Sequence, residues 1–453
     1  MATKTEVAKQ YVDFQQARDF DGLASLLADD VELKMPMAGE VSGKEAVGKR
    51  LRNQPGGDNA PQLQWSDPEE DGDDIKVSAT GAPFGPLSLV LSFNANEQIT
   101  KINIAIGANG GGGFQPPPLN MSWADVPTER PPKPSNFGED GFTLAKADSG
   151  SYGWAPAHWP YQNDTPRGAW PAEDANRGLP APYTIFDKHE VWADNAADLY
   201  ELGIRERWIP ATEVSWGSIE PLDDHVEAAL DQVFTNISET QYNSNQILMG
   251  WLQEISYGFH EVKLYLSTQV FDQARHVEAF RKRALANGGG LGVQMPGFMH
   301  RTVYAAFKFT ELICYINILR ASFLLALAEN EHLPKSEADR QLFGHTANDL
   351  QRHLAFGVDH LKHYIRHDTI NLSHVNTWLA RGEAMMAADL RRDKPLREAL
   401  ILGLGETVEE GKERLDELRQ AQLQKYVKTL EAASVYKREE SLVPAFQRVI
   451  DEP

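Results

Sequence analysis

The stretch STQVFDQARHVEAFRKRAL at residues 267–285 decides the fold of the larger part of the chain. Within it, the motif D-x-x-R-H at 272–276 recurs 77 residues later, at 349–353, inside NDLQRHLAFG. Each copy lies late in the second helix of an expected helix pair. The repeat therefore predicts a pseudo-twofold helical bundle in which His276 and His353 face a common centre.

Helical periodicity extends outward from this repeat and begins near residue 223. It predicts helices over 223–247, 249–286, 300–330, 337–367, 372–392 and 407–433. A glycine-rich stretch at 288–292, followed by Pro296, interrupts the series. Two long helices, a break and two more are typical of a four-helix bundle with one crossover.

Residues 223–367 resemble the ferritin-like superfamily, specifically its di-iron carboxylate oxidases and oxygenases. In that family, each half of the bundle supplies a Glu from one helix and a Glu-x-x-His from the next. The resemblance implies an oxidoreductase, in the manner of an oxygenase, acting on a small organic molecule. It makes His276 and His353 the metal ligands and, together with Gln273 and Gln241, the catalytic residues.

Amides and an apolar residue replace the acids of the family pattern. Gln273, Leu350 and Gln241 stand where glutamates are usual, and the third helix has no acid between 316 and 322. Two imidazoles and two amides cannot balance a di-ferric pair, so a standard di-iron centre is disfavoured. Iron or another divalent metal at an atypical, carboxylate-poor site is the first hypothesis. The alternatives are a metal-free acid–base enzyme that uses the former metal cavity, and a non-catalytic ferritin-like subunit or scaffold.

The inward faces of the helices suggest where a substrate would bind. At about 100° per residue, Gln269, Gln273 and His276 share one face. These residues and Gln241 form either a hydrogen-bonded polar core or a substrate pocket, with Gln269 and Tyr242 as the substrate-binding residues.

Other polar residues of the helices have simpler interpretations. His363 and His367 have the spacing of two metal ligands, but a partly exposed polar face is favoured over a zinc site. Glu254, Glu261 and Glu311 could each restore a carboxylate to a shifted metal site, but charge pairing at the edge of the bundle is favoured for each.

Residues 1–107 are expected to form a small α+β domain. Apolar residues at helical spacing, Val7, Tyr11 and Phe14, predict one helix, and residues 20–28 fit a second. Alternating patterns predict strands over 31–35, 75–80, 87–93 and 99–106, and the acidic stretch 67–74 reads as a solvated loop. The text VAKQYVDFQQARDFDGLASLLADDVELKMPMAGEVSGKEAV at 7–47 resembles the SnoaL-like, ketosteroid-isomerase-like cone fold. By that resemblance, Tyr11 matches the tyrosine that polarises a carbonyl in the isomerases. Met35 lies near the place of their acidic base and cannot accept a proton, so ligand binding, dimerisation or docking is expected instead of isomerisation.

The remaining segments complete a multidomain chain, an N-terminal α+β cone plus an all-α ferritin-like helical bundle. Residues 108–136 read as a Gly/Pro linker, and 137–222 as a Trp-rich segment that wraps around the bundle. The ferritin-like bundle with its C-terminal helices occupies 223–453.

Composition limits the partners. Lys and Arg total 44 and Asp and Glu total 65, a net charge of −21 that argues against nucleic acid. The single Cys314 and the polar N-terminus predict a cytoplasmic protein, and the apolar run 312–328 reads as a buried helix and not a membrane span. The expected partners are a small-molecule substrate and a second copy of the chain or a ferritin-like paralogue.

Overall fold

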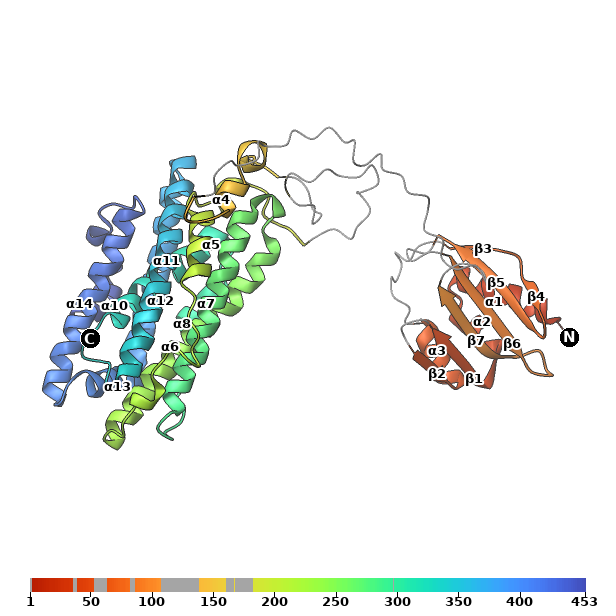
Figure 1. The fold of residues 1–453 in the computed structure, drawn as a ribbon, viewed down its shortest axis with the longest axis horizontal. Helices are drawn as coiled ribbons and strands as arrows, with labels where there is room; N and C mark the ends of the chain where they lie inside the picture. Colours follow the sequence, from red (N-terminus) through yellow and green to blue (C-terminus); the bar gives the residue numbers. More distant parts are fainter. Residues whose placement is uncertain are drawn as a thin grey trace. The chain divides into compact units, whose positions relative to one another are not determined.

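A computed structural model describes residues 2–35, 39–52, 63–81, 86–106, 138–159, 167, 182–295 and 297–453 (Figure 1). The chain divides into two compact units, Met1–Val126 and Pro127–Pro453. The division falls within the predicted linker 108–136, which itself lies outside the described residues. As predicted, the first unit is α+β and the second is mostly helical.

The first unit is built on one sheet with the strand order β2-β1-β7-β6-β5-β3 and with β4 beside β5. Strands β1 and β7 are parallel and the other described pairs are antiparallel. The strands are β1 Leu27–Met35, β2 Gly39–Ser42, β3 Gln64–Trp65, β4 Glu69–Asp71, β5 Asp74–Thr80, β6 Leu87–Phe93 and β7 Ile99–Ile106.

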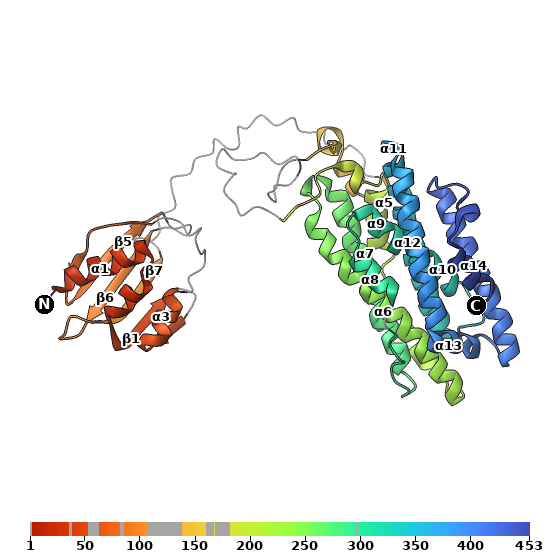
Figure 2. The ribbon, with the colours of Figure 1, turned by 180° about the vertical axis from the view of Figure 1, so that it is seen from behind.

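Three helices share one apolar core with this sheet (Figure 2). They are α1 Lys4–Ala17, α2 Phe20–Ser25 and α3 Lys44–Arg52. The sequence predicted α1 and α2 and the strands β1, β5, β6 and β7, but not α3, β2 or β3. The acidic stretch 67–74, interpreted as a solvated loop, instead contains β4, whose exposed acids pair through the backbone with Asp74, Ile75 and Lys76.

The second unit is a bundle of long helices with short ones between them (Figures 1 and 2). A buried π-helix at Cys314–Arg320 joins α9 to α10. The α-helices are α4 Leu144–Ala147, α5 Ala196–Arg205, α6 Asp224–Glu254, α7 His260–Leu285, α8 Phe298–Tyr304, α9 Phe309–Ile313, α10 Ala321–Ala328, α11 Glu337–His367, α12 Asn371–Arg392, α13 Lys394–Leu404, α14 Val408–Ala432 and α15 Pro444–Asp451.

Two predicted helix boundaries are wrong. The break expected after 247 lies instead at Ile255, where the backbone turns extended before a short 3₁₀ turn at Tyr257–Phe259. Helix α6 continues through Gly250 because packing outweighs the weak helix preference of one glycine. The single helix expected over 300–330 is divided into α8 and the α9–α10 helix, with residues 305–308 between them.

The most apolar helix is part of the core. Phe309–Ala328 is the one described helix long and apolar enough to cross a membrane, but 94% of its most apolar window is buried inside the bundle. This agrees with its interpretation as a core helix.

Part of the described segment of 137–222 packs against the bundle. Helix α5 lies against α7, and the side chains of Trp192 and Trp208 are buried. Trp154 is exposed, and Trp170 lies outside the described residues.

Candidate functional site

The two D-x-x-R-H motifs meet in the middle of the helical unit. The ring centroids of His276 and His353 are 6.3 Å apart, so the predicted approach of the two histidines is confirmed. Six side chains, each at most 3% exposed, form what we call the cross-paired network: Asp272, Arg275 and His276 of α7 and Asp349, Arg352 and His353 of α11.

Each aspartate binds the histidine of the opposite helix. His276 Nε2 lies 3.0 Å from Asp349 Oδ2, and His353 Nε2 lies 3.1 Å from Asp272 Oδ2. Arg275 and Arg352 each pair with both aspartates. Two carboxylates and two guanidinium groups cancel in charge, which makes the burial of all four tolerable.

Burial and these contacts set the protonation of the network. Burial would raise the pKa of Asp349, but His276 and the two guanidinium groups outweigh it and hold that pKa well below its usual range. Burial lowers the pKa of His353 despite the nearby Asp272 carboxylate. Asp349 is therefore charged at neutral pH, and His353 is a neutral imidazole.

Two further residues, which the sequence did not indicate, complete the network. Trp208 Nε1 donates a hydrogen bond of 2.9 Å to Asp349 Oδ2, and Arg352 Nη1 donates to Glu206 Oε2 at 3.0 Å. Both precede the long helices and have no regular spacing relative to the repeat. The sequence indicated only that the Trp-rich segment, to which both residues belong, packs on the bundle.

The predicted amides lie beside the histidines. Gln241 Oε1 is 3.3 Å from His276 Nδ1. Gln273 is 3% exposed, and its Oε1 has no hydrogen-bond partner among the described residues. Gln269 and Asn317 of the π-helix bind each other through both amide groups, at 2.9 and 3.1 Å. The third helix thus offers an amide at this centre, consistent with the lack of an acid at 316–322.

The residues of the predicted substrate pocket do not all face one centre. Tyr242 is 55% exposed, because one step along α6 rotates its side chain away from the side on which Gln241 lies, so it does not join Gln241 at His276. Gln269 is held by Asn317 and Tyr265. Gln241, Gln269, Gln273 and His276 are absent from the walls of two cavities, one lined by α6, α8 and α12 and a smaller one beside Trp251 and Tyr364.

The carboxylates that could have restored a metal site have other partners. Glu261 pairs with Arg167, and Glu311 accepts from Arg381 and Tyr315. The described part of the chain holds one group with metal-like geometry, Asp148, His260 and Glu261. Arg167 is bound to Glu261 and lies 3.6 Å from Asp148, and its positive charge opposes a cation there.

The other histidines of α11 serve packing. His360 is fully buried between Thr310 Oγ1 at 2.9 Å and the carbonyl oxygen of Trp192 at 3.0 Å. Burial lowers its pKa to about 4. His367 stacks on His189 with ring centroids 4.0 Å apart. His363 is half-buried and His367 is exposed, in agreement with a partly exposed polar face.

In the first unit, the two residues singled out by resemblance lie in the sheet and its covering helix. Tyr11 of α1 is buried in the core, and burial raises its pKa. Met35 ends β1 and is half-buried. Nothing about this pair supplies a proton acceptor.

Comparison with known proteins bears on the first unit. A solved SnoaL-like protein of unknown function from Burkholderia thailandensis is 22% identical, with 22% of this chain and 92% of that chain covered and a TM-score of 0.21. An uncharacterised cystatin-fold protein from Novosphingobium aromaticivorans is 19% identical, with 23% and 97% covered and a TM-score of 0.20. No curated protein matches the chain. The SnoaL-like domain family matches residues 8–86, so the chain carries an N-terminal SnoaL-like domain.

Proposed function

We propose that the helical unit is a ferritin-like bundle in which the cross-paired network takes the structural place of a metal centre. The chain then acts as a non-catalytic ferritin-like subunit or scaffold. It assembles either with a second copy of itself or with a ferritin-like paralogue. The observation that carries this proposal is the exchange of partners between the helices, Asp272 with His353 and Asp349 with His276.

The donor set at this centre does not fit a di-iron pair. Both aspartates are paired with Arg275 and Arg352, so the other possible metal ligands at this centre are neutral imidazole and amide groups. A pair of ferric ions needs anionic oxygen ligands to balance its charge. An acid–base enzyme is also disfavoured, because His276 and His353 are at most 2% exposed and each is bound to an aspartate.

A second candidate is the ferritin-like oxidoreductase acting on a small organic molecule through a carboxylate-poor site. One observation favours it. The buried Gln273 Oε1 lacks a partner among the described residues, and a buried amide oxygen without a hydrogen bond is available to bind a cation. Elemental analysis of the full-length protein separates the two candidates. Stoichiometric iron, manganese, zinc or copper that is retained through dialysis supports the oxidoreductase, and substoichiometric metal supports the scaffold.

Replacing Gln273 with glutamate tests the same centre through its effect on thermal stability. The new carboxylate would be buried beside His276, which costs several kcal/mol or keeps the acid protonated. We expect Gln273→Glu to lower the melting temperature in chelator-treated buffer and to regain part of the loss when manganese is added. Differential scanning calorimetry of the full chain measures both changes.

Gln351→Glu is the matched control, because Gln351 belongs to the second motif but is exposed. It should leave the melting temperature nearly unchanged with or without metal. An equally small effect of Gln273→Glu would show that position 273 is not the buried site described above.

A further inference from the structure

A cavity of about 410 Å³ lies within the helical unit, and its wall includes no residue of the cross-paired network. Its wall is formed by α6, α8, α10, α12, α13 and α14. Much of the surface is apolar and includes Val233, Ile237, Phe323, Leu324, Met386 and Leu390. A cavity of this size with an apolar wall and a few polar groups is typical of a small-molecule site.

Two buried guanidinium groups line this cavity. Arg320 ends the π-helix and is 7% exposed, and Arg419 of α14 is 5% exposed. Burial lowers the pKa of each to about 10, so both remain charged at neutral pH. A buried charge is costly unless it is paired, which makes the partners of these two arginines the decisive observation.

Both arginines donate hydrogen bonds to neutral side chains. Arg320 Nη1 donates to Asn243 Oδ1 at 2.6 Å and to Ser244 Oγ at 3.1 Å. Arg419 Nη1 donates to Gln422 Oε1 at 2.7 Å, and its buried Nε has no hydrogen-bond partner among the described residues. Each group therefore retains donors that a ligand could use.

The two acids in the wall are engaged elsewhere. Asp389 accepts from the backbone N–H groups of Phe298 and Met299 at 2.6 and 2.8 Å, at the start of α8. Asp393 accepts from the N–H of Leu396 at 3.0 Å and caps α13. Among the described residues, neither acid forms an ion pair within 4.0 Å of Arg320 or Arg419, although both acids contribute long-range attraction.

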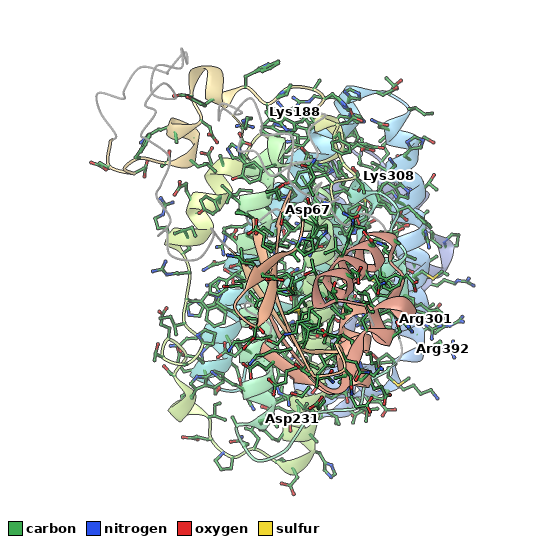
Figure 3. The ribbon with its side chains drawn as sticks, turned by 90° about the vertical axis from the view of Figure 1, so that its right-hand side faces the viewer. Asp67, Lys188, Asp231, Arg301, Lys308 and Arg392 are labelled. Carbon is green, nitrogen blue, oxygen red and sulfur yellow. The ribbon has the colours of Figure 1, made fainter. Side chains whose placement is uncertain are left out.

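The cavity wall is positive in a strongly acidic protein. Arg301 and Arg392 are exposed residues of the same wall and lie on one side of the unit (Figure 3). With Arg320 and Arg419 they give four guanidinium groups against two carboxylates, a surplus of two positive charges. Burial lowers the pKa of His300, which also lines the wall, to about 4, so it adds no charge at neutral pH.

We propose that this cavity binds a small amphipathic carboxylate, with its carboxylate group between Arg320 and Arg419 and its hydrocarbon part against the apolar wall. Guanidinium groups bind carboxylates through paired, charge-assisted hydrogen bonds. The exposed Arg301 and Arg392 would attract the anion toward the entrance. The cavity is separate from the cross-paired network, so this binding is independent of whether a metal binds there.

Isothermal titration calorimetry of the full-length protein tests the proposal with decanoate, decanol and decyl phosphate as probes. We expect decanoate to bind at one site per chain, and decanol, which has the same tail without the charge, to bind about tenfold more weakly or worse. Equal binding of decanoate and decanol would overturn the proposal. Binding of decyl phosphate alone would overturn the assignment of the carboxylate.

Substitutions locate the binding site. Arg320→Gln and Arg419→Gln should each weaken decanoate binding by about tenfold and leave decanol binding unchanged. Arg281→Gln, which changes an exposed arginine on α7, should leave both unchanged. Unaltered decanoate affinity in both cavity variants would overturn the proposal. Decanoate, but not decanol, should raise the melting temperature of the unsubstituted protein. This measurement tests the proposal without any variant.

Discussion

Asp349→Asn is expected to lower the free energy of unfolding of the helical unit by about 3–5 kcal/mol, because it removes one of the two charges that neutralise a pair of buried guanidinium groups. Asp349 accepts from Trp208, His276 and both arginines of the network. Urea unfolding followed by far-ultraviolet circular dichroism measures the loss, since the helical unit dominates that signal.

Two comparisons show whether the loss arises from unpaired charge. Glu278→Gln removes an exposed carboxylate on α7 that pairs with Lys282, and should cost less than about 1 kcal/mol. Adding Arg275→Met to Asp349→Asn removes an unpaired guanidinium and should recover part of the stability. If the double variant is instead less stable by the sum of the two single losses, the charges at this centre are not coupled.

The stability of the helical unit should fall as the pH decreases from about 6.5 to about 4, in part because of His360. In the folded state burial lowers its pKa to about 4, whereas an unfolded histidine has a pKa near 6.5. The unfolded chain therefore binds the proton first, and folding loses stability on the acid side. A difference of this size corresponds to about 3 kcal/mol, present in full above pH 6.5 and lost by pH 4.

The measurement is the change in unfolding free energy between pH 6.5 and pH 4, not its value at one pH. His360→Gln lowers stability at neutral pH by disturbing the bonds to Thr310 and Trp192, but it removes the titrating group and should flatten the decline. His332→Gln, a change at an exposed histidine, should keep the decline of the unsubstituted protein. A decline equally steep in His360→Gln would assign it to other buried groups, such as His300 or His353.

Local patterns in the sequence predicted the elements and the centre of the helical unit. The spacing of Asp272, Arg275 and His276 places all three toward one side of a helix, and the second copy does the same, so their convergence followed from the repeat. Alternating apolar residues predicted strands β5, β6 and β7 within one residue of their observed bounds. These features depend on residues that are close in sequence.

Features that depend on distant residues were not predictable in this way. The contact of Trp208 with Asp349 joins positions 141 residues apart, and no periodic pattern marks it. The cavity is formed where α8, α12 and α14 meet α6, and Arg320 and Arg419 reach it from different helices. Arg320 lies in an almost entirely apolar helix and Arg419 in a helix rich in charged residues, and neither pattern shows that the two side chains line one cavity. The π-helix around Asn317 is also set by packing, since an apolar run does not show how its backbone winds.

The exchange of partners between α7 and α11 has a consequence for folding. Within each helix the arginine pairs with the aspartate three residues before it, but each histidine binds the aspartate of the other helix, 73 or 81 positions away. A nascent chain that has released α6 and α7, but not yet α11, must keep Asp272 and Arg275 hydrated. The α6–α7 hairpin therefore packs only loosely until α11 has been synthesised and can pair with it. The two halves should therefore unfold together, and a protease that cuts between them should not release a stably folded half.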